Sequence, residues 1–558
     1  MAEPQRQVEP ALVPARLARG SRGAVVAPHH LATSAGLAIL AAGGHAVDAA
    51  IAANAVLAVV MPNGCGIGGD AFWLVWDESL GEQTALNGSG RAPAAADPAT
   101  LRAGGLDRIP LRGPLSITVP GAVRSWADAH RRWGRLSRDT VLAAAIEHAE
   151  AGFPAWNGLI EAVEATADTL PAAPWAAGFH QVWRPAGRPW RPGERIRLPA
   201  LAATLRELAG DGFDAFYDGG LGERLVHGLQ AAGGAFALED LRDHASTWAE
   251  PIATTYRGIR VTTHPPNSSG VLALELLDVL ALAEPPPGAA FTSRGWSDAA
   301  WIHRQLEAAK LVLADRDASL TDPEAMAVAV AALLDPGHTA ALAARIDPHR
   351  ADPAPPPART LVGGTIWLGV VDGQGNAVSL IQSNAAGFGS GVVDPATGVH
   401  FQDRGASFSL RPSHPNVLAP RKRTAHTLLP GMLFREERRQ PWIVAGSMGG
   451  DIQPQIHAQL VSALVDGGAD IATAVAAPRV TVEPAGWLAP PVAVRFDGEL
   501  APGVEGGLRA RGHDLGRVAF DGSLGHEHAI ELVDGGPAAG GSLAATTDPR
   551  SAGLPAVR

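Results

Sequence analysis

The tripeptide Gly363-Gly364-Thr365 is the segment of this sequence best suited to chemistry. It follows a proline-rich connector, residues 347–359, and opens the apolar run TIWLGVVD, which is typical of a buried strand. The threonine hydroxyl can attack the preceding carbonyl carbon, which gives an ester by an N-to-O acyl shift, and water then cleaves that ester. Gly364 favours the attack because it adds no side chain beside the carbonyl. The released threonine has an α-amine with a pKa of roughly 7.7–8.0, so the amine can act as general base for its own hydroxyl.

Three other motifs contain residue types that bind ligands, but their context favours structural roles. Gly64, Gly66 and Gly69 fit a dinucleotide-binding G-x-G-x-x-G motif by letter, yet this turn follows a helix and opens a strand, the reverse of the required order. The segment 526–528, His-Glu-His, offers two imidazoles, but no third ligand has a convincing spacing for a metal. Cys65 lies in an apolar, glycine-rich turn, which indicates a small buried residue rather than a nucleophile. We therefore expect neither a metal nor a cofactor.

Hydrophobic patterning predicts helices before the connector and mainly strands after it. The expected helices lie within residues 31–61 (two helices joined at Gly43-Gly44), 121–133, 138–151, 198–208, 219–232, 300–314 and 454–464, and the expected strands lie within 71–76, 365–372, 376–383 and 442–445. The connector itself cannot form a regular element because it is rich in proline. The chain is therefore expected to combine α and β structure around the predicted cleavage point.

Composition limits the class of protein and its partners. Hydrophobic residues make up 46% and charged residues 18%, which predicts a folded protein with a large core. The net charge is −11 and no block of Lys or Arg occurs, so we expect neither a nucleic-acid nor a membrane partner. The single cysteine, the absence of a signal-peptide pattern and the absence of a run of about 20 apolar residues predict a cytoplasmic protein.

Many ordered segments of the chain resemble the γ-glutamyltransferase family of N-terminal-nucleophile hydrolases. They run from HHLATSAG through PNGCGIGGDAFWLVWD, EAAKLVLADRDA, GGTIWLGVVD and GSMGGDIQPQ to the closing TTDPRSAG. This resemblance supports self-cleavage, for which Gly-Gly-Thr alone is a weak signal because it is usually only a turn before a strand. It implies an α/β fold, the four-layer αββα sandwich, cut into a large subunit, residues 1–364, and a small subunit, residues 365–558. The two would form one intertwined heterodimer, and pairing of such heterodimers is left open.

The resemblance also implies the catalytic residues. Thr365 matches the family nucleophile, although the Thr and His that usually follow it are absent. Ser383 stands where a family threonine supports the nucleophile through a hydrogen bond, and it keeps the hydroxyl. Gly449 and Gly450 match the glycine pair whose N–H groups form the oxyanion hole, where loss of one donor costs roughly 3–4 kcal/mol in a characterised protease.

Positions that bind the γ-glutamyl group in the family have changed in this sequence. Ser407 falls at the aspartate that holds the substrate α-amino group, and Arg404 falls at a nearby glutamine. His426 and Thr427 replace a serine pair that binds the glutamyl carboxylate, while Arg91 lies two residues from the match to a large-subunit arginine. A desolvated ammonium needs a carboxylate partner, so these substrate-binding candidates favour an anionic or neutral acyl group over a zwitterionic one.

Three functions remain open from the sequence. The first is an autoprocessed amidohydrolase, similar to a glutathione hydrolase, that cleaves a small amide through a Thr365 acyl-enzyme. The second is an oxamate-type amidohydrolase of the same family, because Arg404, Arg91 and His426 suit a small anion without an ammonium. The third is an unprocessed relative that binds small molecules without catalysis. Hydrolysis and acyl transfer are not distinguished, although the short loop over residues 409–421 favours an open site and hydrolysis.

Overall fold

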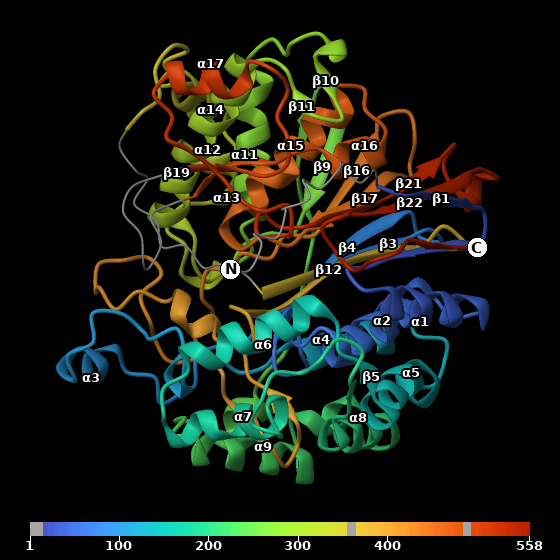
Figure 1. Ribbon diagram of the computed structural model, residues 1–558, viewed down its shortest axis with the longest axis vertical. Helices are drawn as coiled ribbons and strands as arrows, with labels where there is room; N and C mark the ends of the chain where they lie inside the picture. Colours follow the sequence, from blue (N-terminus) through green and yellow to red (C-terminus); the bar gives the residue numbers. More distant parts are fainter. Residues whose placement is uncertain (1–14, 354–363, 484–492) are drawn as a thin grey trace, which may run out of the picture.

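Two β-sheets lie face to face between two layers of helices (Figure 1). The computed structural model describes residues 15–353, 364–483 and 493–558. This four-layer arrangement confirms the αββα sandwich predicted from the sequence. The predicted connector falls within the described residues only as far as residue 353, and Gly363 lies outside them.

The first sheet carries the predicted nucleophile. Its antiparallel strands are, in spatial order, β23 (Ala556–Val557), β2 (Gly23–Val26), β12 (Gly364–Asp372), β13 (Ala377–Ala385), β3 (Asp70–Asp77), β4 (Glu82–Gly88) and β7 (Thr247–Ala249). Successive side chains of β12 point to opposite faces of the sheet. Ile366 and Leu368 pack against helices, whereas Trp367 and Val371 pack against the second sheet. Both faces of the sheet are therefore buried, which explains the almost continuous apolar runs in β3, β12 and β13.

The second sheet closes over the first. Its antiparallel strands are, in spatial order, β1 (Leu17–Gly20), β22 (Ser542–Thr547), β21 (Glu527–Val533), β17 (Pro441–Ser447), β16 (Gly431–Arg435), β9 (Ile259–Thr263) and β8 (Ile252–Tyr256). Segments before and after the Gly364–Thr365 bond contribute strands to both sheets. The two predicted subunits would therefore share both sheets of the sandwich.

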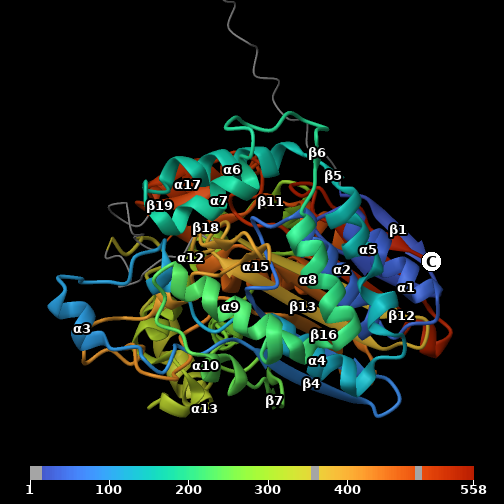
Figure 2. The same ribbon diagram turned by 90° about the horizontal axis from the view of Figure 1, so that it is seen from below.

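Helices cover the outer face of each sheet. The first sheet is covered by α1 (His30–Ala41), α2 (Ala46–Val60), α4 (Ala122–Trp133), α5 (Arg138–Ala151), α6 (Asn157–Thr169), α7 (Ala177–Trp183), α8 (Pro199–Asp211) and α9 (Gly219–Ala231), as Figure 2 shows from below. The second is covered by α11 (Gly270–Ala281), α12 (Ala299–Ser319), α13 (Val330–Leu333), α14 (Pro336–Ala343), α15 (Gln453–Val465), α16 (Ile471–Ala476) and α17 (Val504–Ala510). The remaining α-helices of the described residues are two short ones, α3 (Pro98–Ala103) and α10 (Leu238–Arg242). None of the helices within the described ranges is long and apolar enough to cross a membrane.

Helix α2 shows why the sequence between residues 46 and 60 is apolar throughout. All of its residues are buried, because the helix lies between α1, α5 and the first sheet. His45 and Asp48 cap its first turn, with the His45 backbone N–H donating to the Asp48 carboxylate over 2.9 Å. The two helices predicted within residues 31–61 are thus confirmed as α1 and α2, and they form the support beneath β12 and β13.

Candidate active site

Thr365 begins a row of three polar residues that crosses the first sheet. It is paired with Ser383 on β13, and Ser383 is paired with Asp70 on β3. All three are at most 1% exposed. Because side chains alternate along a strand, this row shares the face of Trp367 and Phe72, which is turned towards the second sheet. The row therefore lies between the two sheets.

The Ser383 hydroxyl lies between the predicted nucleophile and the carbonyl that it would attack. It donates to the Gly364 carbonyl oxygen over 2.6 Å and accepts the N–H of Ala385 over 2.8 Å. Thr365 Oγ1 lies 2.9 Å from Ser383 Oγ. A hydroxyl has only one hydrogen, and that of Ser383 goes to Gly364, so the Thr365 hydroxyl is the donor to Ser383. Ser383 thus polarises the Gly364 carbonyl and orients Thr365 Oγ1 in the uncut chain.

The backbone at the predicted cleavage point is irregular. The register of β12 against β13 shifts between Gly364 and Thr365, and the opposing Ala385 has a φ of +74°. A residue with a Cβ pays about 1–3 kcal/mol for such a conformation. A Cβ at Gly364 would lie 2.4 Å from the carbonyl oxygen of Asn63, so only glycine fits there. Bulges and local strain of this kind concentrate next to active sites.

The glycine pair Gly449-Gly450 forms the turn between β17 and α15. The φ angles are +147° for Gly449 and +59° for Gly450, both in the region that favours glycine. The two sheets touch nearby, since a Cβ on Gly446 would lie 2.2 Å from Trp367 Nε1. Thr365 and the glycine turn therefore both lie within four residues of one contact between β12 and β17. The oxyanion-hole role of the two N–H groups stays a prediction.

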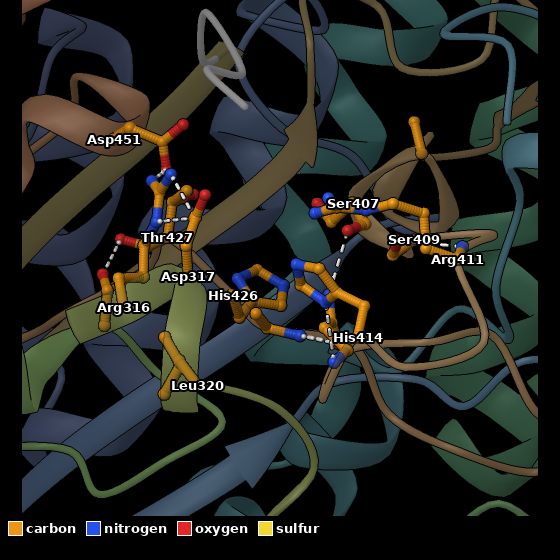
Figure 3. A pocket seen from close by; sticks show the side chains of 14 residues that line it. Arg316, Asp317, Leu320, Ser407, Ser409, Arg411, His414, His426, Thr427 and Asp451 are labelled. Atoms are coloured by element: carbon orange, nitrogen blue, oxygen red, sulfur yellow. Dashed lines mark hydrogen bonds and ion pairs between the residues drawn. The ribbon is translucent and has the colours of Figure 1, made fainter. Parts of the chain in front are cut away.

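A cavity of about 80 Å³ lies next to this turn. Ser407, His426 and Thr427, three of the predicted substrate-binding residues, line it, and so does Asp451, which follows Gly450. Figure 3 shows Ser407 on one side of the cavity, Thr427 and Asp451 on the other, and His426 between them. The structure thus brings together side chains that are up to 44 residues apart along the chain.

Residues 32–557 match the protein family described as gamma-glutamyltranspeptidase. The chain belongs to the gamma-glutamyltranspeptidase family. It is 39% identical to the oxamate amidohydrolase proenzyme of Klebsiella pneumoniae over 96% of this chain and 98% of that protein. It is 36% identical to a glutathione hydrolase-like proenzyme of Bacillus subtilis, over 96% and 98% of the two chains. The crystal structure of a cephalosporin acylase from Bacillus halodurans superimposes with a TM-score of 0.89 at 35% identity, covering 100% of this chain and 99% of that one. The resemblance seen in the sequence is confirmed, and the chain is an enzyme of this family.

Arg404 differs from the other substrate-binding candidates because it is a buried cation, two of whose guanidinium nitrogens have no hydrogen-bonding partner among the described residues. It lies in the short helix η6 (Arg404–Ser407), is 2% exposed, and its Nε and Nη1 atoms have no partner among the described residues. Burial lowers its pKa, and the nearby carboxyl groups of Asp70, Asp403 and Asp451 act in the opposite direction. Buried polar groups are normally hydrogen-bonded, so these atoms call for a ligand or water. This burial excludes a role for Arg404 in a solvent-exposed surface ion pair.

The guanidinium of Arg91, a predicted substrate-binding residue, is bonded to acidic partners. Its guanidinium pairs with Asp322 over 3.1 Å and with Glu324 over 2.8 Å. A third contact, 3.0 Å long, goes to the carbonyl oxygen of Arg421. Neither Arg91 nor Arg404 lines the cavity. The two differ in pairing: the donors of Arg91 are occupied by these partners, so a structural role fits its position better.

His426 lines the cavity, but both ring nitrogens already have protein partners. Nδ1 accepts the N–H of Leu428 over 3.4 Å, so Nε2 carries the hydrogen and donates to Asp70 Oδ2 over 3.2 Å. Burial lowers the pKa of His426, as does the nearby Arg404, so the ring is neutral. A structural role for this histidine is therefore favoured over direct contact of its nitrogens with substrate.

Asp70 is the polar residue of the site that the sequence analysis missed. The segment PNGCGIGGD was interpreted as a packing turn, and this holds for Gly69, where a Cβ would lie 2.5 Å from the carbonyl oxygen of Ser383. The aspartate that ends the motif starts an otherwise apolar strand on the face of Phe72 and Leu74. A carboxylate at an inward position of a buried strand was the signal that could have identified it.

The remaining motifs take structural roles among the described residues. Cys65 is fully buried, and burial raises the pKa of its thiol, which leaves it unreactive. His528 Nδ1 accepts the backbone N–H of Asp548 over 3.0 Å, and the Glu527 N–H donates to the same aspartate over 2.8 Å. The His-Glu-His segment thus anchors the C-terminal strands to each other.

Asp451 connects the glycine turn to helix α12. Its carboxylate lies 2.5 Å from Arg316 Nη1, and the same guanidinium pairs with Asp317 over 3.0 Å. Arg316 lies before the predicted cleavage point and Asp451 after it, so this buried ion pair would join the two subunits. Breaking a buried pair leaves an uncompensated charge, which is strongly destabilising locally.

We expect Arg316→Met to lower kcat by at least about tenfold, because a displaced glycine turn weakens the oxyanion hole, where one lost donor costs about 10²–10³ in rate. The measurement is kcat of the cut protein with its best substrate. Arg509→Met provides the control, since Arg509 forms an exposed pair with Glu505 on α17. An unchanged kcat in Arg316→Met would show that the ion pair does not position the turn.

Proposed function

We propose that the chain cuts itself between Gly364 and Thr365 and that the freed Thr365 is the nucleophile of an amidohydrolase. The protein is an autoprocessed amidohydrolase of the gamma-glutamyltranspeptidase family, whose relatives carry the word proenzyme in their names. The observation that carries the nucleophile assignment is the Ser383 hydroxyl, which contacts both Thr365 Oγ1 and the Gly364 carbonyl oxygen.

Self-cleavage follows from this geometry. Thr365 Oγ1 attacks the Gly364 carbonyl carbon, and the negative charge that develops on the carbonyl oxygen is stabilised by the Ser383 hydroxyl. The C–N bond then breaks, the nitrogen takes up a proton, and Gly364 is left as an ester on Thr365. Water hydrolyses the ester, which gives a carboxylate at Gly364 and a free amine at Thr365.

The cut enzyme repeats the same chemistry on a substrate amide. The Thr365 amine accepts the hydroxyl proton while Oγ1 attacks the substrate carbonyl, and the N–H groups of Gly449 and Gly450 stabilise the tetrahedral intermediate. The leaving amine takes the proton, and the acyl group remains on Thr365 as an ester. Water releases the acid and regenerates the free threonine, which completes a hydrolytic cycle.

The acyl group is proposed to be small and anionic. The buried Nε and Nη1 atoms of Arg404, which have no partner among the described residues, support a carboxylate ligand, since a guanidinium binds carboxylates with two parallel hydrogen bonds. The 39% identity to an oxamate amidohydrolase points in the same direction. A γ-glutamyl substrate is the second candidate, supported by the 36% identity to a glutathione hydrolase-like protein.

A substrate panel on the cut protein tests these two candidates. It contains oxamate, glutathione, a γ-glutamyl anilide and an acylated β-lactam, and the measurement is kcat/KM for each. Oxamate or a similar short acid amide is expected to give the highest value. A higher kcat/KM for the γ-glutamyl compounds would reject the anionic acyl group and leave the family assignment intact.

Ser383→Ala is expected to slow self-cleavage by about 10²–10³, because it removes the one hydroxyl that donates to the Gly364 carbonyl oxygen. The measurement is the fraction of cut chain against time on a denaturing gel. Ser383→Thr is the matched control, since it keeps a hydroxyl on the same carbon and is expected to cut within about tenfold of the wild-type rate. Equal rates in Ser383→Ala and the wild type would contradict the role given to Ser383.

A further inference from the structure

The Asp70 carboxylate collects hydrogen bonds from three separate segments of the chain. It accepts the backbone N–H of Gly90 over 2.9 Å, Nε2–H of His426 over 3.2 Å and the side-chain amide of Gln402 over 3.4 Å. The residue is 1% exposed and belongs to the same sheet row as Thr365. A carboxylate with three donors from distant segments fixes those segments relative to one another.

Two of these segments carry the residues expected to bind the acyl group. Gln402 also accepts the backbone N–H of Arg404 through its side-chain oxygen, so Asp70 is one hydrogen bond away from the start of η6. His426 precedes Thr427, and both line the cavity beside the glycine turn. The Asp70 carboxylate therefore connects the strand that supports Ser383 to both walls of the substrate site.

We propose that Asp70 is a positioning residue of the acyl-binding site, whose ionised carboxylate holds the Arg404 and His426 segments in place for binding a small anionic acyl group. This inference rests on the proposed function of Thr365. It assigns Asp70 no contact with the reacting atoms. Its effect on substrate is transmitted through the two segments that it holds.

The hydrogen-bond pattern requires the ionised form of Asp70. All three partners are donors, because His426 Nδ1 is already an acceptor and its hydrogen is therefore on Nε2. A protonated carboxyl group offers less acceptor capacity and adds a donor that faces other donors. Among the described residues, the charged or titratable side chains that interact with Asp70 are Arg404, Arg423, His426 and Tyr217.

Ionisation of this carboxyl group falls close to neutral pH. Burial raises the pKa of Asp70 to about 7, although Arg404, the Gly90 and Gly121 N–H groups and Arg423 act in the opposite direction. The site is therefore expected to bind anionic substrate better as the pH rises through about 7. The free Thr365 amine, with a pKa of roughly 7.7–8.0, is active as a base only when it is deprotonated. It therefore gives a second rise of activity with pH, which does not depend on Asp70.

The same shift has the opposite effect on stability. The folded protein holds the Asp70 proton more tightly than the unfolded chain does, because the pKa lies above the ordinary value of 3.8. Between pH 4 and pH 7 the folded state thus binds more protons, and this group's contribution to stability falls as the pH rises. If Asp70 only supported the fold, its ionisation would lower stability without improving substrate binding.

Asp70→Asn tests the inference, with Asp77→Asn as the matched control. Asp77 ends the same strand β3, and its carboxylate accepts Nε1–H of Trp133 over 2.9 Å, away from the cavity. Both variants are expected to cut themselves. In Asp70→Asn, kcat/KM for oxamate at pH 8 is expected to fall roughly ten- to hundredfold, mainly through KM, and the rise near pH 7 is lost. Asp77→Asn is expected to stay within about twofold of the wild type and to keep that rise.

Thermal unfolding provides the second measurement. The Tm of Asp70→Asn minus that of the wild type is expected to increase from pH 5 to pH 8. At high pH only the wild type carries a buried charge at this position, and that charge destabilises its folded state. A wild-type pH profile and a constant Tm difference in Asp70→Asn would overturn the inference. An inactive or uncut wild type would instead overturn the proposed function.

Variants at His426 cover the case in which Asp70→Asn does not fold. His426→Gln keeps an N–H donor near the Nε2 position, whereas His426→Leu removes it. We expect His426→Gln to retain most of the wild-type kcat/KM. We expect the kcat/KM of His426→Leu to fall by about as much as that of Asp70→Asn. Equal losses in both His426 variants would show that the hydrogen bond to Asp70 is not what holds this segment.

Discussion

Replacing Thr365 with alanine is expected to leave the protein as one uncut chain without amidohydrolase activity. The substitution removes the hydroxyl that lies 2.9 Å from Ser383 Oγ, and therefore the atom that would attack both Gly364 and the substrate. No other nucleophile is available in this row, since Ser383 already gives its hydrogen to the Gly364 carbonyl oxygen. A denaturing gel reports the cut, and the substrate panel reports the activity.

The wild type and Thr365→Ser are the controls for this prediction. The wild type is expected to give two fragments, residues 1–364 and 365–558, that copurify because both sheets mix strands from the two. Thr365→Ser keeps a hydroxyl and is expected to cut, more slowly than the wild type. A Thr365→Ala chain that is cut at the same bond would place the nucleophile elsewhere. A wild type that never cuts would favour the non-catalytic binding relative.

The second large effect is expected from Arg404→Met, which keeps the length of the side chain and removes its charge. If the Nε and Nη1 atoms bind a substrate carboxylate, the loss of these charge-assisted hydrogen bonds costs roughly 1.5–3 kcal/mol. This corresponds to a fall in kcat/KM of about 10- to 150-fold for an anionic substrate. Self-cleavage is expected to continue, because Arg404 is not bonded to Thr365, Ser383 or Gly364 in the described structure.

Arg91→Met is the matched control for Arg404. Its donors are taken up by Asp322, Glu324 and the Arg421 carbonyl group, so its kcat/KM is expected to stay within about threefold of the wild type. The measurement is kcat/KM for oxamate and for a neutral amide with each variant. Equal losses in both variants, or a loss in Arg404→Met that does not depend on substrate charge, would contradict carboxylate binding by Arg404.

Several parts of the site could be predicted because they lie close together in the sequence or follow from periodicity. The strand–turn–strand pattern around residues 373–375 places Thr365 and Ser383 on adjacent strands, and the structure confirms this pairing. Gly364 was expected to be free of steric conflict, and the close approach of Asn63 shows why a side chain is excluded. The helices α1 and α2 follow from a mainly apolar run, and α2 is buried along its whole length.

Other parts could not be predicted because they depend on contacts between distant segments. Arg91 looked suitable for binding an anion, but its distance in sequence from Asp322 and Glu324 hid the ion pairs that occupy it. His426 looked like a ligand-binding group, and its hydrogen bond to Asp70 spans 356 residues. Both residue types are suited to binding an anion. In the folded protein, however, each side chain is bonded to a partner from a distant segment of the chain.

The sequence by itself determined the nucleophile candidate, its supporting hydroxyl, the glycine turn and the αββα architecture. Residue type and local spacing indicated the Gly364–Thr365 site only weakly. The supporting hydroxyl, the glycine pair and the αββα architecture followed from the resemblance of ordered segments along the whole chain to the family. Only the tertiary structure decided which charged groups are free to bind substrate. Burial and pairing set the availability of a charge, and these depend on which segments the two sheets bring together. Two guanidinium nitrogens of Arg404 are therefore left without a partner among the described residues, Arg91 is paired with Asp322, and Asp70 lies in the row that begins at Thr365.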